Sequence, residues 1–350
     1  GVGVEVQDAL GVRTENFLSS VTREHITAHG ALVDGVHYRG ECMTRDGAMP
    51  WCEELVVPSY STAKSLIAGL AYLALKKEMR GLESESMGAH LEEVPEGWRD
   101  VTVGELLDMR SGHYESVAYM VDEASTTMGA FFLARGDAEK YAAALAFPEG
   151  RGASQVPWVY HTSDTFLATR VMQAILQARH SSELMVWLEE EVFAPIALSM
   201  TARRAYLHTT REDTGERQHQ GGYGSFWHVD DLLRIVQDLV EQERGDLSAS
   251  ELRYDLEALR GVLQRREDQG TRAHDESVHV VGNVHYFKGF WAIEVGPSDG
   301  FPCEAVIPFL SGFGGLTVAI LPNDTIYYVI GDGDEFLWFD AAKELAKLPG

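Results

Sequence analysis

The sequence is poor in positive charge, in long hydrophobic runs and in cysteine. Its 29 Lys+Arg stand against 54 Asp+Glu, and the formal net charge is −25. Such a field repels phosphate backbones and anionic membrane surfaces, so we expect neither nucleic acid nor a membrane as a partner. The longest apolar stretch, residues 66–75, has about half the length that a bilayer-spanning helix needs. We attribute the acidity to a solvated surface, with attraction of a cationic substrate as the less favoured explanation.

The three cysteines, Cys42, Cys52 and Cys303, are too few for a disulfide framework and show no CxxC spacing. Cys42 and Cys52 could pair across a hairpin, but we expect free, buried thiols, which favours a reducing compartment. No signal-peptide pattern opens the sequence, although a chain that starts at Gly1 can have been processed. We therefore expect a soluble protein, with the compartment open between the cytoplasm and an exported location.

With 45% hydrophobic and 24% charged residues, the 350-residue chain has the composition of a globular protein of about two domains. Strand patterns gather at its two ends. Near the start, residues 29–33 and 36–40 flank Asp34-Gly35, a strong hairpin signal. Near the end, β-branched and aromatic residues predict strands over residues 278–281, 290–295, 316–321 and 325–330.

Between these ends, apolar residues recur with helical spacing. Helices are predicted over residues 65–77, 103–109, 138–145, 165–178, 183–193 and 229–241, with a last helix over 335–348. The layout predicts an α/β (α+β) fold in which strands from both chain ends share one antiparallel sheet flanked by helices. Residues 1–64 and 265–350 would form the sheet domain, residues 65–264 a mainly helical inserted region, and the cleft between them the site. Before residue 30, only the strand-like alternation of Val2, Val4 and Val6 is visible.

The segment Pro58-Ser-Tyr-Ser61-Thr-Ala-Lys64 precedes an apolar helix and carries the strongest chemical signal. Ser61 is expected at the helix N-terminus, where unpaired backbone N–H groups favour a nucleophilic hydroxyl, with Lys64 one turn later on the same face. A lysine desolvated by an apolar helix has a lowered pKa and accepts the serine proton as a neutral amine. The structural alternative makes Ser61 an N-cap and Lys64 a solvated charge. Of the seven lysines, only Lys64 has a serine three residues before it.

This segment resembles the Ser-x-x-Lys nucleophile motif of the serine β-lactamase and penicillin-binding-protein superfamily. Three further segments resemble, in order, stretches of its class C-like branch, which includes carboxylesterases and aminohexanoate-oligomer hydrolases. They are Val101-Thr-Val-Gly-Glu-Leu-Leu-Asp-Met-Arg-Ser-Gly-His113, residues 191–200 and residues 221–232. The resemblance runs from about residue 30 to residue 330 and implies the β-lactamase/transpeptidase-like fold.

The resemblance also implies a catalytic tyrosine. The Tyr-x-Asn motif of the branch falls on Tyr160-His161-Thr162, so Tyr160 would work with Lys64 in proton transfer to and from Ser61 and the leaving group. A phenol beside an ammonium is expected to have a lowered pKa and to relay a proton. Packing before a helix start is the structural alternative for Tyr160. Thr162 replaces an Asn that would contact an acyl side chain, which disfavours β-lactam recognition.

The Lys-Thr-Gly or His-x-Gly strand element of the family resembles Ser-Gly-Phe-Gly-Gly-Leu at residues 311–316. In this alignment Phe313 takes the place of the cation, and Gly314 and Gly315 let the backbone approach a ligand. The N–H of Leu316 would complete an oxyanion hole with that of the nucleophile Ser61. A phenyl ring does not bind the carboxylate of a β-lactam or a cell-wall peptide, so Phe313 favours simple esters or linear amides.

The remaining candidates have structural explanations that we favour. His25 and His29 lack the HExxH pattern and are expected on a helix or strand surface rather than at a metal. Residues 332–335 resemble a fragment of a calcium loop and are expected to form a helix-start turn. Candidates for the cleft wall, with core packing as the alternative for most of them, are Tyr60, His113, Tyr114, Trp158 and Trp291.

The sequence therefore predicts a serine hydrolase that cleaves a small-molecule ester or amide through an acyl-enzyme on Ser61, without a metal or an organic cofactor. Within enzymes, the alternative is β-lactamase or DD-peptidase activity. Outside them, it is a non-catalytic binding module on the same fold, which the departures at Thr162 and Phe313 favour and the intact set of Ser61, Lys64 and Tyr160 disfavours. The oligomeric state stays open.

Overall fold

The computed structural model describes residues 10–11, 21–150, 156–245, 247–248, 250–265, 278–281, 283–336 and 338–349. Val2, Val4 and Val6 lie outside this part of the chain. Within the part that is described, no helix combines the length and the apolar character needed to cross a membrane.

Strands from both ends of the sequence form one antiparallel sheet, as predicted. Its eight strands lie in the order β2-β1-β14-β13-β12-β11-β10-β9. They are β1 Ile26–Val33, β2 Val36–Arg39, β9 Val278–Val281, β10 Val284–Phe287, β11 Phe290–Val295, β12 Ala305–Gly312, β13 Leu316–Ile320 and β14 Ile326–Gly331. Asp34 and Gly35 turn β1 into β2 with φ angles of 48° and 76°, the positive values that a two-residue hairpin turn needs.

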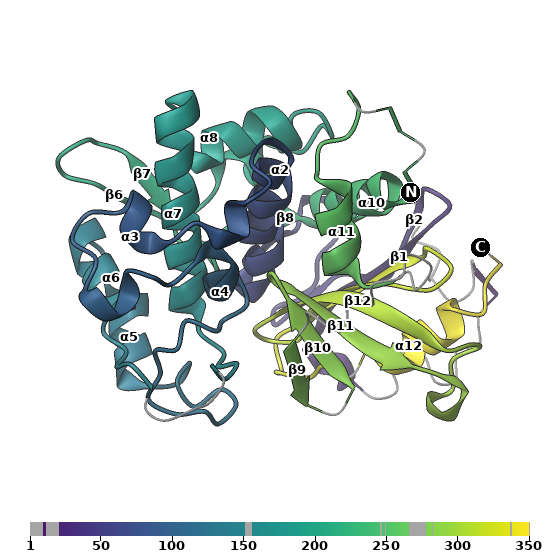
Figure 1. Ribbon diagram of the computed structural model, residues 1–350. Coiled ribbons are helices and arrows are strands. Elements are labelled where there is room, and N and C mark those ends of the chain that lie inside the picture. Colours follow the sequence, from purple (N-terminus) through teal and green to yellow (C-terminus); the bar gives the residue numbers. More distant parts are fainter. Residues whose placement is uncertain are drawn as a thin grey trace.

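Most helices occupy the sequence between the two groups of strands and lie beside the sheet (Figure 1). The helices are α2 Leu70–Glu78, α3 Met87–His90, α4 Val103–Leu107, α5 Thr126–Leu133, α6 Asp137–Ala144, α7 Thr162–His180, α8 Leu184–Leu188, α9 Met200–Arg204, α10 Val229–Arg244, α11 Leu256–Leu263 and α12 Phe339–Leu345. Short strand pairs lie outside this sheet: β3 Met43–Thr44 with β4 Gly47–Ala48, β5 Val56–Pro58 with β8 Phe226–His228, and β6 His208–Thr210 with β7 Arg217–His219.

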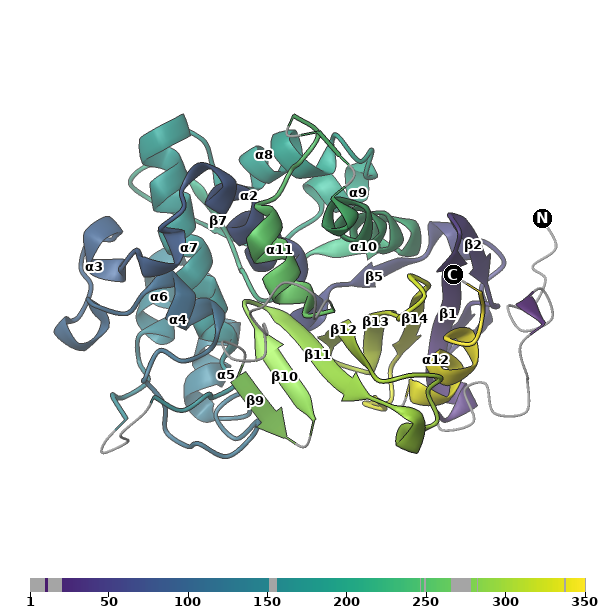
Figure 2. The ribbon, with the colours of Figure 1, turned by 45° about the vertical axis from the view of Figure 1, so that its right-hand side comes forward.

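The sheet separates two hydrophobic cores because its strands point alternate side chains to opposite faces. Val318 and Ile320 of β13 belong to the larger core, which they share with α2, α7, α10 and α11. Ala319, between them, faces the smaller core under α12. In Figure 2, α12 accordingly lies on the sheet face opposite to α10 and α11. The larger core therefore packs the helices against one face of the sheet.

The segment at residues 101–113, a specific family match in the sequence, joins the helices to the sheet. At the end of α4, Asp108 accepts a hydrogen bond from the backbone N–H of Lys288 at 2.8 Å and forms a buried ion pair with its Nζ. Lys288 lies in the turn between β10 and β11. The next residue, Met109, accepts a hydrogen bond at its carbonyl from the N–H of Val159 (3.0 Å). The motif therefore holds the chain next to Tyr160 in place.

The observed elements differ from the predicted ones in several places. The helix predicted over residues 65–77 begins as a π-helical turn, Lys64–Gly69, before α2. The helix predicted over residues 335–348 is shortened to α12, so residues 332–335 follow the end of β14 and do not start a helix, contrary to expectation. Elements present in the structure and absent from the prediction include the helices α3, α5, α9 and α11, the sheet strands β10 and β12, and the short strands β3 to β8.

Cys42 and Cys52 form a disulfide bond, so the expectation of free, buried thiols is wrong for this pair. The hairpin of β3 and β4 lies between them and brings their Cα atoms to 5.4 Å, a separation typical of disulfides. Cys303 is free, as expected, but it is exposed rather than buried.

Candidate active site

A sharp bend in the backbone places Ser61 at the start of the buried helix. After β5, Tyr60 adopts a φ of 42°, a region that bulky side chains rarely occupy and that often marks a functional site. Ser61 lies in the 3-10 turn Tyr60–Thr62, and Lys64 opens the π-helical turn Lys64–Gly69. The two side chains thus lie one turn apart on one face, as the spacing predicts.

Lys64 is buried, with 1% of its surface exposed, and its amine contacts three oxygen atoms. Its Nζ lies 3.0 Å from Oγ of Ser61, 2.7 Å from Oγ1 of Thr162 and 3.5 Å from the carbonyl oxygen of Gly222. Burial lowers the pKa of Lys64 to about 8, although the negative charge of Glu123 acts in the opposite direction. At pH 7, about a tenth of the Lys64 amine is therefore neutral, far more than for an exposed lysine.

Tyr160 lies beside the same amine, with its ring centroid 4.7 Å from Nζ of Lys64 and its hydroxyl hydrogen-bonded to Ser61. Its ring stacks on Trp291 with the centroids 6.1 Å apart. The predicted lowering of the Tyr160 pKa is wrong, because burial, and after it the charge of Glu123, raises this pKa far above its usual value. Tyr160 is thus a neutral phenol that can donate a proton.

Thr162 connects Lys64 to Glu123, a residue that the sequence analysis missed. The Thr162 hydroxyl, which accepts from Lys64, donates to Oε1 of Glu123, and the Thr162 backbone N–H donates to Oε2 at 3.0 Å. Glu123 lies in the loop before α5, where no spacing or motif marks it. The one available signal was Thr162 itself, since a threonine in place of an asparagine implies a different polar neighbour for the lysine.

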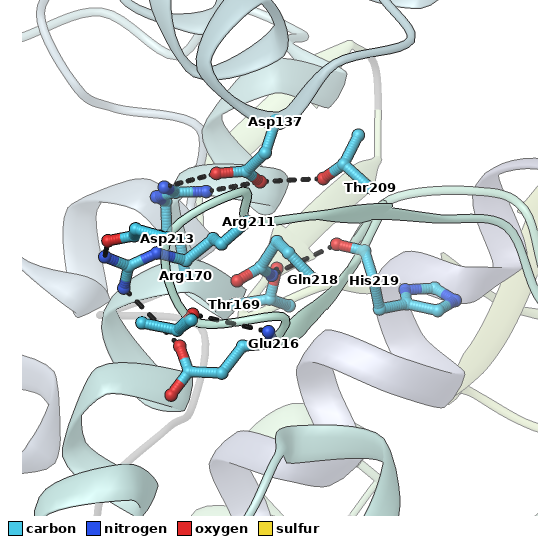
Figure 3. Close-up of polar contacts among 10 residues, drawn as sticks. Asp137, Thr169, Arg170, Thr209, Arg211, Asp213, Glu216, Gln218 and His219 are labelled. Carbon is cyan, nitrogen blue, oxygen red and sulfur yellow. Dashed lines mark hydrogen bonds and ion pairs between the residues drawn. The ribbon is translucent and has the colours of Figure 1, made fainter.

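The carbonyl that faces Lys64 belongs to a turn between β7 and β8. In this turn, the N–H of Gly221 donates to Nδ1 of His219 at 2.9 Å, and Nε2 of the same ring lies 2.9 Å from Oγ of Ser225. The Gln218 side chain reaches Oγ1 of Thr169 on α7 at 3.4 Å (Figure 3). The turn is therefore attached to the helix that begins at Thr162.

Asp137 joins α6, α7 and β6 near this turn (Figure 3). Both of its oxygens accept hydrogen bonds from Arg170, at 2.9 and 2.8 Å, and Oδ1 also accepts from Thr209 at 2.8 Å. Burial of Asp137 acts to raise its pKa, but Arg170 and Thr209 outweigh burial and the pKa is lowered. The carboxylate is held in its charged form and cross-links three elements behind the site.

Ser61 opens into a cavity of about 630 Å³ lined by residues of the sheet and of the helical part. Aromatic side chains make up half of the lining: Tyr60, Tyr119, Phe132, Tyr160, Tyr223, Trp291, Phe313 and Phe336. Glu123 and Asp334 are its charged members, and none of the described residues that line it is Lys, Arg or His. The cavity can accept a hydrophobic group and holds no cation for a carboxylate at its surface.

The strand beside Ser61 is β12, whereas the predicted oxyanion donor Leu316 begins the next strand, β13. Residues 311–313 line the cavity, whereas Leu316 is 1% exposed on β13 and is absent from the lining. Gly314 and Gly315, with φ of 85° and 101°, form the turn between β12 and β13 and lie outside the lining too. The glycines serve the hairpin turn, which places Leu316 on the strand beyond β12.

The other candidates are divided between the cavity and the interior. Tyr60 and Trp291 line the cavity, while Tyr114 and Trp158 do not. His113 is also away from it, because its ring is buried and stacks on Trp98 with the centroids 3.7 Å apart. His25 pairs with Glu335 at 3.1 Å. The described part of the chain contains no group of three or more His, Cys, Asp or Glu arranged to hold a metal ion.

Known families and solved structures share this fold. The family model described as Beta-lactamase matches residues 25–330. No curated protein has a sequence that matches this chain.

Three solved structures show the likeness in detail. A D-alanine carboxypeptidase AmpC from Burkholderia cenocepacia is 14% identical, covers 98% of this chain and 96% of its own, and gives a TM-score of 0.59. A candidate 6-aminohexanoate-dimer hydrolase from Bacillus anthracis is 15% identical over 96% of this chain and 85% of its own, with a TM-score of 0.63. Simvastatin synthase (LovD) from Aspergillus terreus, in a mutant form, is 15% identical over 95% of each chain, with a TM-score of 0.57. The fold predicted from the motifs is confirmed.

Proposed function

The chain belongs to the beta-lactamase family, whose serine-hydrolase fold it has, and we propose that it cleaves a carboxylic ester or a linear amide through an acyl-enzyme on Ser61. The observation that carries this proposal is the 3.0 Å contact between Nζ of Lys64 and Oγ of Ser61 at the wall of a cavity. A buried amine with a pKa of about 8 is suited to take a proton from a hydroxyl nucleophile.

In the acylation step, neutral Lys64 accepts the proton of Ser61 while Oγ bonds to the substrate carbonyl carbon. The carbonyl electron pair moves to its oxygen and returns as the bond to the leaving group breaks. Tyr160, a neutral phenol hydrogen-bonded to Ser61, gives its proton to the leaving alcohol or amine and is reprotonated by the Lys64 ammonium. In deacylation, water attacks the ester carbonyl while Lys64 takes a proton from it, and the Lys64 ammonium gives this proton to Oγ of Ser61 as the bond between Oγ and the acyl carbon breaks.

The developing oxyanion would lie between the backbone N–H groups of Ser61 and Ser311. Pairing of β11 with β12 ends at Phe309, so the main chain of Ser311 has no strand on its cavity side. The Gly312 carbonyl accepts from the N–H of Gly315 in the hairpin turn. Because successive residues of a strand point their polar groups to opposite edges, the N–H of Ser311 points away from β13.

The lining of the cavity favours an uncharged, hydrophobic acyl or leaving group. Phe313 is 63% exposed and lines the cavity, and in the family resemblance it takes the place of a cation that would bind a substrate carboxylate. The charges of Glu123 and Asp334, together with the net charge of −25, further disfavour an anionic substrate. β-Lactams and peptides with a terminal carboxylate are therefore the less favoured substrates, and esters and linear amides the favoured ones.

The proposal is tested with p-nitrophenyl butyrate and three proteins: wild type, Ser61→Ala and Ser84→Ala. Ser84 is an exposed serine outside the cavity lining and serves as the matched control. Wild type and Ser84→Ala are expected to release p-nitrophenol at equal rates, and Ser61→Ala at a rate lower by about 10³-fold or more. The wild-type rate should rise with pH through about 8, as the Lys64 amine becomes neutral.

Equal hydrolysis by Ser61→Ala and wild type would exclude Ser61 as the nucleophile. If wild type does not cleave this ester, a fluorophosphonate probe and intact mass decide the question. One adduct on wild type and none on Ser61→Ala supports the reactive serine and directs the search to linear amides. No adduct on either protein contradicts the proposal and supports a non-catalytic binding module.

A further inference from the structure

The side chains of Lys64 and Glu123 are joined through the Thr162 hydroxyl, and this one group can donate only one hydrogen bond. A threonine hydroxyl has one proton to donate, and in Thr162 this proton is directed at Oε1 of Glu123. The oxygen of that hydroxyl is then left to accept, and it accepts from Nζ of Lys64 at 2.7 Å. Glu123 therefore fixes the direction of the hydrogen bond that holds the amine.

Glu123 is also docked by the backbone of the helix that carries Thr162. Thr162 is the first residue of α7, and the preceding His161 makes no side-chain capping bond. The N–H of Thr162 is one of the donors that a helix start leaves unpaired, and it donates to Oε2 of Glu123 at 3.0 Å. With both oxygens engaged by one residue, the carboxylate has little freedom to turn away from the site.

The loop before α5 that carries Glu123 is itself anchored by its neighbour Asp122. Oδ2 of Asp122, which is 1% exposed, accepts from the N–H of Glu115 at 2.8 Å and lies 2.9 Å from Nε2 of His161. Asp122 and His161 directly precede Glu123 and Thr162 in the sequence. Two parallel contacts therefore join the loop to the start of α7, one inside the core and one at the cavity.

We propose that Glu123 is a positioning residue of the hydrolase site: through the Thr162 hydroxyl it holds the Lys64 amine against Ser61 and sets the charge of that amine. This inference rests on the proposed function and extends it to a group outside the family motifs. Tyr160, Thr162 and the Gly222 carbonyl also face the amine and carry no charge in their ordinary states. Among the described residues, Glu123 is the charged group that acts on Lys64.

The electrostatics give the proposal a direction. Burial lowers the pKa of Lys64 and Glu123 raises it again, so removal of the negative charge must lower this pKa further. A neutral amide at residue 123 would leave more of the amine unprotonated at a given pH. The acidic limb of the pH–rate profile then moves to lower pH, even where the maximal rate falls because Thr162 is held less firmly.

The test compares Glu123→Gln with wild type by two measurements. In the first, ¹³C-labelled lysine reports the titration of the seven lysines, with the Lys64 signal assigned by its loss in Lys64→Met. In the second, the pH profile of kcat/KM is recorded with p-nitrophenyl butyrate. We expect the Lys64 midpoint and the acidic limb to move together to lower pH by about one unit in Glu123→Gln.

Three variants separate this role from a purely structural one. Asp334→Asn removes the other carboxylate of the cavity, which accepts a hydrogen bond from the N–H of Gly314 at 3.0 Å and is not hydrogen-bonded to Lys64 or Thr162. The acidic limb of its pH–rate profile should stay at the wild-type pH. Thr162→Val removes the hydroxyl and should lower kcat by about tenfold or more. Thr162→Ser keeps the hydroxyl and should restore most of the rate.

An unchanged Lys64 midpoint in Glu123→Gln would overturn the inference, as would full activity in Thr162→Val. If Glu123→Gln lowers the melting temperature and leaves the Lys64 midpoint unchanged, Glu123 only stabilises the start of α7. The NMR titration needs no turnover, so it separates the two proposals. A shifted midpoint without any hydrolysis or serine labelling in wild type would support the coupling and contradict the proposed function.

Discussion

At the scale of single residues, Gly222 leaves no room for a side chain beside Lys64. A Cβ at this position would lie 2.9 Å from Cγ2 of Thr162 and 3.3 Å from Nζ of Lys64. Both neighbours are buried, so one of them has to move. We expect Gly222→Ala to lower kcat by about 10- to 100-fold, because small displacements of catalytic groups cost this much.

Gly129→Ala is the matched control for this prediction. Gly129 lies within α5, and a Cβ there meets no atom within 4 Å. Its replacement should leave the rate unchanged and raise the free energy of unfolding by about 0.5–1 kcal/mol, since alanine is the better helix former. Kinetics well below the melting temperature, with thermal unfolding of each variant, give the comparison. If Gly222→Ala has the same kcat as wild type, the rate does not depend on the exact position of the Lys64 amine.

The residues that the sequence could predict are those whose spacing alone puts them together. Ser61 and Lys64 are one helical turn apart, and the structure brings them into contact. Tyr160 depends on long-range packing, and only the family motif pointed to it. Glu123 was missed because a loop residue has no periodicity, and Thr162 indicates a different polar neighbour without naming it. Leu316, the predicted oxyanion donor, lies on β13 and outside the cavity lining, because the sequence does not say where β12 ends and its hairpin turn begins.

At the scale of elements, the Cys42–Cys52 disulfide closes the short β3–β4 hairpin against the larger core, to which Cys42 belongs. We expect replacement of both residues by alanine to lower the free energy of unfolding by about 2–3 kcal/mol, chiefly by freeing the unfolded chain. Urea unfolding measures this loss. Catalysis should persist, because neither residue lines the cavity.

Thiol counting provides the independent check. The unfolded, unreduced chain should react with Ellman's reagent at one cysteine, and after reduction at three. Cys303→Ala is the control: it should abolish the first reaction and leave the stability nearly unchanged, since Cys303 is exposed. Three reactive thiols before reduction would show that the pair is open.

Some of the elements that were not predicted from the sequence contain residues that are unusual in such elements. β12 contains Pro308, which is unusual in a central strand because it lacks the N–H that a ladder uses; in the structure it pairs with Ala292 of β11. In α5, glycine and two threonines dilute the helical pattern. α11 had the usual amphipathic spacing and a capping residue, Asp255, so its omission reflects no conflict in the sequence. The strands β1, β13 and β14 were predictable because their apolar runs end at clear turns.

At the scale of the whole molecule, buried histidines contribute to how the stability responds to mild acid. Burial lowers the pKa of His219 to about 3 and that of His29 to about 4, with smaller contributions from His208 and Arg23 respectively. For His161, burial also disfavours the charged form, but Asp164 and Asp122 outweigh it and raise the pKa. The first two histidines are neutral in the folded state, whereas His161 favours its charged form.

These shifts have opposite signs in the pH dependence of stability. A histidine whose folded pKa is lowered binds a proton only in the unfolded chain below pH ~6.5, so its contribution is complete above that pH and is lost as the pH falls. For His161, the stabilisation is present below ~6.5 and is lost as the pH rises through its raised folded pKa. Burial lowers the pKa of His113 as well, so three shifted histidines favour folding above pH ~6.5 and only His161 favours it below, among the described residues with a resolved shift.

His219→Gln tests this balance at one position. Nδ1 of His219 accepts a hydrogen bond from the N–H of Gly221. A proton on Nδ1 would therefore point at this N–H and break the hydrogen bond. Glutamine takes up no proton in this pH range, so the variant does not have this source of destabilisation. Between pH 6 and 4.5, the unfolding free energy of wild type should fall more steeply than that of the variant, by up to about 1.4 kcal/mol per pH unit. Urea unfolding across this range measures both slopes. The difference at pH 8 reports only the altered packing, so parallel curves from pH 8 to 4.5 would show that His219 takes up its proton in the folded state.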